Sequence, residues 1–172
     1  KSVIPIKFSL AKSQGPVVFQ SIFSDNPGVT ANDASYLTFI PTNTLTFPDI
    51  TTLSTVYAFS EGNCHGGSLR WHVSLPTGNI FIYYGAQTNF TDCITAGSAT
   101  NQSGLNILNF TDLRFDTTQL GGKFYDTYAN ALLLAGNAPI DGVSLALDGG
   151  WAGDQRLTPS NVTVNDNTFM PA

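Results

Sequence analysis

Charged residues are unusually scarce in this sequence. Asp, Glu, Lys and Arg together make up only 11% of its 172 residues, against roughly 25% in an average soluble domain. Glutamate occurs once, at Glu61, and the formal net charge is −5. Such scarce cations exclude nucleic acid as a partner, because nucleic-acid affinity depends on Lys and Arg side chains that neutralise phosphates. The scarcity of Glu also excludes a long charged helical bundle.

Long apolar runs are missing as well. No segment approaches the roughly 18 consecutive apolar residues that a membrane-spanning helix requires, so we expect no membrane span. The apolar fraction of 42% is nevertheless enough for one hydrophobic core. No repeat or charged linker divides the chain, and residues 1–172 are predicted to form a single domain.

Catalytic groups are few. The chain has two histidines, His65 and His72, and it lacks both a Gly-x-Ser-x-Gly elbow and a His-Glu-x-x-His helix. A glycoside hydrolase would need two carboxylates on facing strands. The candidate carboxylates lie in sequences typical of turns, where Asp caps or turns the backbone: Glu61, Asp116, Asp148 and Asp154. We therefore predict that the chain is not an enzyme.

Uncharged polar residues take the place of charge: the chain has 20 Thr, 14 Ser and 14 Asn. Four of these asparagines lie in Asn-x-Ser/Thr glycosylation sequons, namely Asn89, Asn101, Asn109 and Asn161. The chain begins at Lys1 without an apolar leader, which is typical of a mature chain whose targeting peptide has been removed. Together these features predict a secreted, extracellular or cell-surface glycoprotein.

The two cysteines, Cys64 and Cys93, are predicted to form a disulfide. The bond would close a loop of roughly 30 residues and stabilise the fold by roughly 3–4 kcal/mol. The alternative is two unpaired buried thiols. A zinc site would need Cys64 and His65 with two further ligands, and only His72 remains at sensible spacing, so no metal site is predicted here.

Alternation of apolar and polar residues is the main structural signal. It is clearest over residues 68–75, where one face carries Leu69, Trp71, Val73 and Leu75. A tight turn at 76–79 leads to residues 80–84, which are apolar on both faces, as in a central strand. Further strands are predicted at residues 17–23, 36–40, 55–60, 105–110, 143–148 and 161–165.

Only residues 124–135 have helical spacing, and Gly136 provides a stop signal at their end. One stripe of this segment carries Phe124, Tyr128, Leu132 and Ala135. The pattern as a whole predicts an all-β protein: a β-sandwich of two antiparallel sheets with one short helix.

The N-terminal residues 1–12 have two interpretations. Alternation places four apolar residues on one face: Ile4, Ile6, Phe8 and Leu10. The segment is then either an ordinary edge strand of its own sandwich, which Pro5 favours, or a strand donated to a neighbouring subunit by β-strand addition. Residues 11–16 would be a hinge-like spacer in the second case.

Ligand-binding residues are predicted on the polar face of segment 68–75. Sugar sites on β-sandwiches combine aromatic platforms with side chains that bind hydroxyl groups. Arg70 and His72 share this face, and Trp151 is the aromatic residue expected to be most exposed, with Tyr83 or Tyr84 nearby. Calcium would require Asp carboxylates with loop carbonyls, and turn-forming roles are favoured for the candidates Asp148, Asp154 and Asp166.

Two stretches resemble known secreted proteins. Residues 141–151 (Asp-Gly-Val-Ser-Leu-Ala-Leu-Asp-Gly-Gly-Trp) and 160–165 (Ser-Asn-Val-Thr-Val-Asn) resemble the last two strands of secreted jelly-roll domains of the carbohydrate-binding-module type. Those domains often end in Asp-Asn-Val-x-Val, and Ser160 replaces the Asp here. Residues 64–71 look like a Cys-Gly-Gly-Ser-x-Arg element of secreted microbial proteins. The resemblance implies a jelly-roll fold and secretion, and it transfers no ligand.

These observations leave three functions, in order. The first is a non-catalytic extracellular structural glycoprotein, a cell-surface or pilus-like filament subunit that self-associates through its N-terminal strand. Sparse charge favours it, because charged side chains are what protects sheet edges from pairing with other chains. The second is a carbohydrate-binding module with a glycan as partner, and the third is a glycoside hydrolase.

Overall fold

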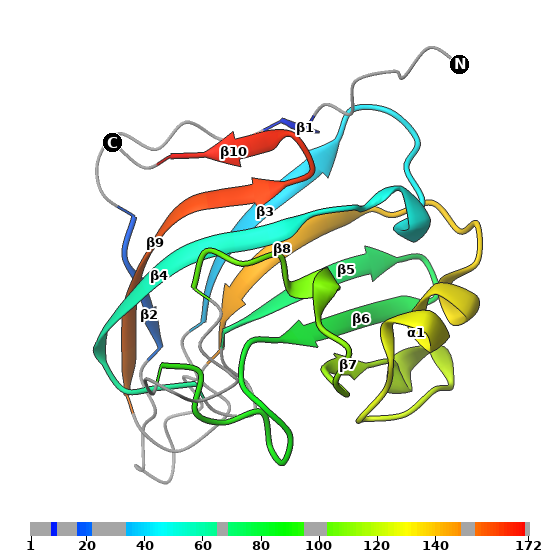
Figure 1. The fold of residues 1–172 in the computed structure, drawn as a ribbon. Helices are drawn as coiled ribbons and strands as arrows, with labels where there is room; N and C mark the ends of the chain where they lie inside the picture. The colour runs from blue at the N-terminus through cyan, green and yellow to red at the C-terminus, as the bar shows by residue number, and fades with distance from the viewer. Residues whose placement is uncertain are drawn as a thin grey trace, which may run out of the picture.

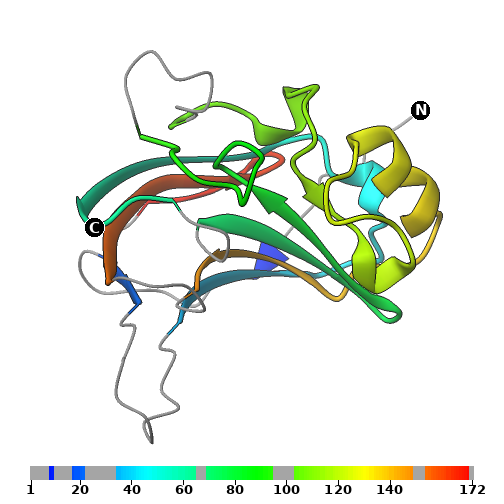
Figure 2. The ribbon, with the colours of Figure 1, turned by 90° about the horizontal axis from the view of Figure 1, so that it is seen from below.

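The alternating segments of the sequence form two antiparallel β-sheets packed face to face, as Figure 1 shows from one side and Figure 2 from below. The structure is a computed structural model. It describes residues 8–9, for which only the backbone is considered, and residues 17–21, 34–64, 69–94, 103–148 and 154–170. None of the helices in these ranges is long and apolar enough to cross a membrane.

The larger sheet has six strands. Their spatial order is β1 (Phe8–Ser9), β3 (Ser35–Pro41), β8 (Gly142–Leu147), β5 (Arg70–Leu75), β6 (Gly78–Tyr83) and β7 (Phe115–Asp116). Neighbours therefore come from distant parts of the chain: β8 lies between β3 and β5 and pairs with both. β5 and β6 form a hairpin, which confirms the predicted turn and its two strands.

The smaller sheet is built around β9 (Gln155–Val164), the longest strand. One edge of β9 pairs along its length with β4 (Leu53–Glu61). The other edge pairs with β2 (Phe19–Ser21) at one end and with β10 (Asn167–Phe169) at the other. Every strand of this sheet thus depends on β9.

The chain crosses several times between the two sheets. β2 and β4 belong to the smaller sheet, whereas β3 between them belongs to the larger one, and β8 and β9 again lie in different sheets. This crossing is the pattern of a jelly roll, in which hairpins fold over each other to give two facing sheets. The predicted fold class, an all-β, jelly-roll-like sandwich with one short helix, is confirmed.

The core lies between the sheets and contains the apolar face predicted for β5. Trp71 and Val73 are fully buried there, with Leu69 just before the strand. The indole Nε1 of Trp71 donates to the hydroxyl of Tyr84 at 2.8 Å, which satisfies both polar atoms in the core. Apolar alternation therefore identified the inward residues of this strand correctly.

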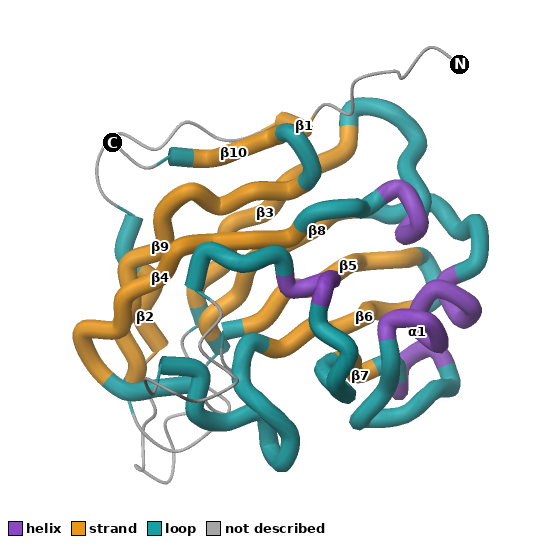
Figure 3. Tube along the Cα trace, in the orientation of Figure 1, coloured by secondary structure: helices purple, strands orange, loops and turns teal. Residues whose placement is uncertain are grey.

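The α-helix is shorter than the sequence predicts. α1 spans Tyr128–Ala135, whereas the predicted helix begins at residue 124. Asp126 is instead held by backbone hydrogen bonds to Phe115, and Thr127 caps the helix by accepting from the amide of Asn130 at 3.1 Å. Figure 3 shows α1 at one end of the sandwich, near the 3₁₀-helices η1 (Phe47–Asp49) and η3 (Thr118–Leu120).

The prediction of a strand at residues 105–110 is wrong. The segment forms the 3₁₀-helix η2 (Ile107–Asn109), because the Asn106 side chain accepts from the amide of Leu108 at 3.2 Å. The same oxygen accepts from the amide of Leu53 at 3.0 Å, which fastens the segment to the start of β4. A polar side chain thus overrides the apolar pattern that suggested a strand.

Strand boundaries also differ elsewhere. β9 begins at Gln155, well before the strand predicted at 161–165, and it carries a bulge at Asn161, where φ is +46°. The short strands β7 and β10 have no counterpart among the predicted elements. Both are too short to show a recognisable alternation.

The N-terminal strand is described only at Phe8 and Ser9. These residues pair antiparallel with Pro41 and Ile40 at the outer edge of β3. The other members of the predicted assembly strand (Ile4, Ile6 and Leu10) and the spacer 11–16 lie outside the described residues. The described pairing is that of an edge strand on β3.

Candidate functional site

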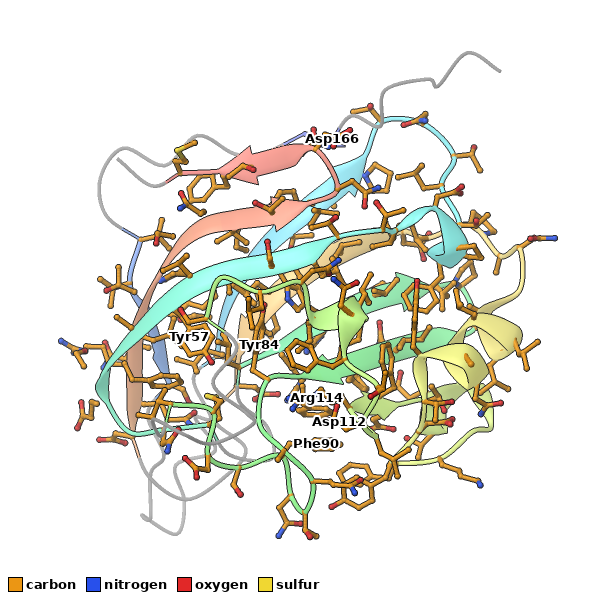
Figure 4. All side chains as sticks on the ribbon, in the orientation of Figure 1. Tyr57, Tyr84, Phe90, Asp112, Arg114 and Asp166 are labelled. Atoms are coloured by element: carbon orange, nitrogen blue, oxygen red, sulfur yellow. A yellow bond between two sulfur atoms is a disulfide. The ribbon has the colours of Figure 1, made fainter. Side chains whose placement is uncertain are left out.

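The predicted disulfide joins Cys64 and Cys93, whose Cα atoms are 5.4 Å apart and whose side chains are buried. The carbonyl of Cys93 accepts from the hydroxyl of Tyr57 at 2.8 Å, and the Tyr57 ring meets the Tyr84 ring edge to face at 5.3 Å. Figure 4 shows these two tyrosines side by side. The disulfide therefore anchors the segment after β6 to the core rather than forming a surface feature.

The polar face predicted for β5 points away from the core, on the outer face of the larger sheet. Antiparallel pairing places residues of five strands side by side on this face. One row contains Tyr36, Ala146, Arg70 and Tyr83, and the next contains Thr38, Ser144, His72, Phe81 and Asp116. Arg70 and His72 thus lie in the middle of the sheet. We call Tyr36, Arg70, His72, Phe81 and Asp148 the outer-face site.

Arg70 is the centre of this site, although its side chain is only 10% exposed. Its Nη2 donates to Oδ2 of Asp148 at 2.5 Å, and its Nε donates to Nε2 of His72 at 2.6 Å. The guanidinium carbon lies 5.1 Å from the Phe81 ring centre and 5.8 Å from that of Tyr83, within the range of cation–π attraction. Arg70 is therefore fixed in position by a carboxylate, an imidazole and two aromatic rings.

His72 is uncharged in this environment. Burial, reinforced by the neighbouring Arg70 cation and opposed by Asp148, lowers the pKa of His72 to about 3. Its Nε2 accepts the hydrogen bond from Arg70, so this bond assigns the single ring proton to Nδ1. The imidazole meets the Phe81 ring edge to face at 4.7 Å. His72 is thus held as one tautomer whose Nδ1–H is a hydrogen-bond donor.

Tyr36 provides the exposed aromatic surface of the site. It is 53% exposed, and its ring meets that of His72 at 5.7 Å, which means that it leans across β8. Beside it on the same face, the hydroxyls of Thr38 and Ser144 are hydrogen-bonded to each other at 2.8 Å. The accessible part of the outer face therefore combines one aromatic ring with several hydroxyl groups.

The other aromatic candidates have different surroundings. Tyr83 is on the outer face, but it is covered by the ring of Phe90, stacked at 3.8 Å, and burial raises the pKa of Tyr83 to about 12. Tyr84 points into the core, so of the two tyrosines offered as alternatives it is Tyr83 that lies beside Arg70. Trp151 lies outside the described residues.

A second arginine, Arg114, lies just before β7 and is 1% exposed. Its Nη1 donates to the backbone carbonyls of Tyr84 at 2.6 Å and Gly85 at 3.2 Å. Its other nitrogens form two hydrogen bonds with the carboxylate of Asp112, at 2.5 and 2.8 Å, a pair labelled in Figure 4. Arg114 fixes the start of the loop that follows β6.

The carboxylates considered for catalysis or calcium are dispersed. Asp148 is bonded to Arg70, and Asp116 accepts from the amide and hydroxyl of Thr118. Glu61 ends β4, Asp154 precedes β9, and Asp166 lies beyond the far end of β9, as Figure 4 shows. No three His, Cys, Asp or Glu side chains gather as a metal site within the described ranges. That the chain is not an enzyme, and that these aspartates form turns rather than bind calcium, stay predictions.

Three of the four sequon asparagines are exposed: Asn89, Asn109 and Asn161. Asn101 lies outside the described residues. Asn89 is in the loop after β6, where its backbone N–H donates to the hydroxyl of Tyr125 at 2.8 Å. Exposure makes the three asparagines accessible to modification, and their glycosylation stays a prediction.

Two surface cavities occur away from the outer face. One, of about 350 Å³, is lined by Tyr57, Ala58, Phe59, Ile94 and Ser103. The other, of about 310 Å³, lies between η2 and the start of α1 and is lined by Leu108, Asn109, Phe110, Thr111, Thr127, Tyr128 and Ala129. Neither lining contains a charged side chain, so neither matches the polar site predicted from the sequence.

Sequence reasoning placed Arg70 and His72 on one face but missed Tyr36, Phe81 and the role of Asp148. Alternation within residues 36–40 does put Tyr36 on the face of Thr38. It does not reveal that β3 lies two strands from β5, so the contact between Tyr36 and His72 could not be inferred.

Comparisons of this chain with protein-family models, with curated proteins and with solved structures found no match.

Proposed function

We propose that this chain is a non-catalytic extracellular domain that binds glycans at the outer-face site. The observation that carries the proposal is the exposed Tyr36 ring in contact with His72, beside the Thr38–Ser144 hydroxyl pair. Sugar rings present apolar C–H faces and hydroxyl groups, which an aromatic platform and nearby polar side chains can bind.

Preorganisation of the outer-face site supports the same proposal. Arg70 is bonded to both Asp148 and His72, so the imidazole does not need to reorient when a ligand arrives. The sheet itself is rigid, because β5 is paired on both sides along its length. Weak contacts to hydroxyl groups gain most from a surface that is already ordered.

A glycan array tests the proposal. The parent protein is compared with Arg70→Ala, His72→Ala and Trp151→Ala, each checked for folding by circular dichroism. We expect the parent to bind at least one glycan, and His72→Ala to weaken that binding by about tenfold, the equivalent of one lost hydrogen bond. Binding to no glycan would refute the proposed function. Equal binding by all variants would show that the glycan binds at another site on the protein.

Assembly by strand addition is a second candidate, favoured by the pairing of Phe8 and Ser9 with the edge of β3. An edge that accepts this segment from its own chain presents the same backbone groups to the segment of another copy. In that arrangement, residues 1–12 of each subunit would complete the sheet of the next. The product is a homo-oligomer or a filament.

Deletion of residues 1–12 tests this candidate by sedimentation velocity and negative-stain imaging. We expect the parent to form oligomers or filaments and the truncated chain to be a soluble but less stable monomer. An unchanged oligomeric state after deletion would refute strand addition and leave glycan binding unaffected.

Glycosylation is part of the same proposed extracellular role. The intact mass of the protein, secreted from a cell that performs N-glycosylation, is expected to exceed the mass of the polypeptide. Asn→Gln substitutions at residues 89, 109 and 161 should each remove one glycan mass. A secreted protein of unmodified mass would refute glycosylation at these exposed asparagines.

A further inference from the structure

We propose that the outer-face site selects uncharged glycans over glycans that carry carboxylate or sulfate groups. The inference rests on the proposed glycan-binding function and specifies its ligand class. It follows from how the outer face uses its one arginine, from which polar atoms the face exposes, and from the sign of its remaining charges.

The arginine of the outer-face site, Arg70, is already paired with a carboxylate. An acidic glycan binds most strongly where a cation can reach its anionic group. The cation of Arg70 is already paired with Asp148, whose side chain is 27% exposed and lies closer to solvent than that of Arg70. An incoming carboxylate would have to displace Asp148 from the guanidinium or approach beside it, and like charges at that distance repel.

In the described part of the chain, the other charge on this face is also negative. Asp116 is the cross-strand neighbour of Phe81, so its carboxylate lies on the outer face. The other cations in the described part of the chain are Arg114, which is buried, Arg156, which is on the smaller sheet, and Lys123, which lies beyond β7. Among the residues that the structure describes, Arg70, Asp116 and Asp148 give this face an excess of one negative charge, which disfavours anions.

The accessible polar groups suit hydroxyls. The Thr38 and Ser144 hydroxyls and the phenol of Tyr36 can each donate and accept, as sugar hydroxyls do. His72 adds an uncharged N–H donor, because its other ring nitrogen is occupied by Arg70. A neutral sugar can satisfy these groups in both directions, whereas a carboxylate only accepts hydrogen bonds.

The apolar part of the face points to the same ligand class. Tyr36 and Ile40 are both largely exposed and lie four residues apart on β3, on the same side of the sheet. Contact with the C–H face of a pyranose ring needs no charge on the ligand. Binding by such contacts and neutral hydrogen bonds is expected to depend little on salt.

The test compares two soluble glucans that share one backbone, one unmodified and one oxidised at C6 to the uronate. Affinities of the parent, Tyr36→Ala and Leu133→Ala are measured by titration calorimetry at low and high NaCl. Leu133 is an exposed apolar residue on α1, 80% exposed, and is the matched control. An array of neutral, uronate and sulfated glycans widens the search beyond glucans.

We expect the parent to bind neutral glycans with an affinity that changes by less than about twofold with salt. Tyr36→Ala should weaken this binding by about tenfold or more, whereas Leu133→Ala should leave it unchanged. Preference for uronate or sulfated glycans, lost in Tyr36→Ala, would overturn the neutral-ligand inference and retain the glycan-binding function. Neutral binding that Tyr36→Ala leaves intact would overturn the inference, and binding to no glycan would refute the function itself.

Discussion

The two buried arginines, Arg114 and Arg70, are each paired with an aspartate, yet they are used differently. Arg114 donates to backbone carbonyls at the end of β6 as well as to Asp112. In the contacts described above, Arg70 donates to the side chains of His72 and Asp148 and lies within cation–π distance of two aromatic rings. The first arginine holds the chain in its path, and the second arranges side chains on a surface.

This difference explains what each site can do. Backbone carbonyls that Arg114 satisfies are buried, so removing the guanidinium leaves acceptors that water cannot reach. Asp112 at this site is 44% exposed and can be hydrated when its partner is lost. At Arg70 the partners lie nearer to solvent, and their loss changes the surface more than the fold.

The largest effect is expected for Arg114→Met. The carbonyls of Tyr84 and Gly85 would lose their donor in a buried place, at a cost of about 1–3 kcal/mol each, so the free energy of unfolding should fall by about 2–6 kcal/mol. Urea denaturation measures the change, with Arg70→Met as the matched variant. A loss of less than about 1 kcal/mol would show that Arg114 does not hold this loop.

Loss of the disulfide should lower the free energy of unfolding almost as much as Arg114→Met does. Replacement of Cys64 and Cys93 by Ser opens a loop with a sequence separation of 29, and the chain-entropy model assigns about 3–4 kcal/mol to its closure. Because the bond lies in the core and not on the outer face, affinity for a glycan should not change in the folded variant. Urea denaturation and calorimetry measure the two quantities. Unaltered stability, or altered affinity, would contradict this division.

A smaller loss of stability is expected for Arg70→Lys. Lysine cannot bond His72 and Asp148 through the separate Nε and Nη2 positions that Arg70 uses, so about 1–2 kcal/mol should be lost. The ¹⁵N shifts of the His72 ring should show that Nε2 no longer accepts a fixed hydrogen bond. Arg156→Lys is the control, since Arg156 is exposed and its guanidinium donates a hydrogen bond to the side chain of Gln20 at 3.2 Å. Unchanged imidazole shifts would contradict the positioning role of Arg70.

The smallest effect concerns pH. The folded-state pKa of His72 is about 3, whereas in the unfolded chain it is near the usual 6.5. Between these values the unfolded chain binds a proton that the folded chain does not, so stability falls as pH falls. From about pH 7 to about pH 5.5 the loss should be about 1 kcal/mol.

His72→Gln isolates this titration. Other acids and bases, including the neighbouring Arg70, Asp148 and Tyr36, are common to both proteins, so the difference between their pH profiles reports on His72. The parent should lose more stability than His72→Gln across this pH window, in urea titrations at each pH. Parallel profiles would show that His72 is not held in its neutral form.

The sequence predicted those features that depend on short stretches of chain. Alternation placed Trp71 and Val73 in the core and Arg70 on the opposite face of the same strand. The cysteine pair was identified because two polar turn contexts and a secreted composition favour a bond. Residues 105–110 were mistaken for a strand because the capping role of the Asn106 side chain is not visible in an apolar pattern.

The candidate site depends on strand order, which local pattern does not contain. Asp148 and Arg70 are 78 residues apart and meet because β8 is inserted between β3 and β5. Tyr36 reaches His72 for the same reason. The predictions therefore included individual members of the site without the contacts that bring them together.

The dependence of the smaller sheet on β9 has a consequence for how the protein is made. Leu53 pairs with Val164, so β4 waits for its partner until more than one hundred further residues have been synthesised. Pairing between distant segments slows folding, typically to milliseconds or seconds in all-β domains. The smaller sheet can therefore form only after β9, its last long strand, has been synthesised.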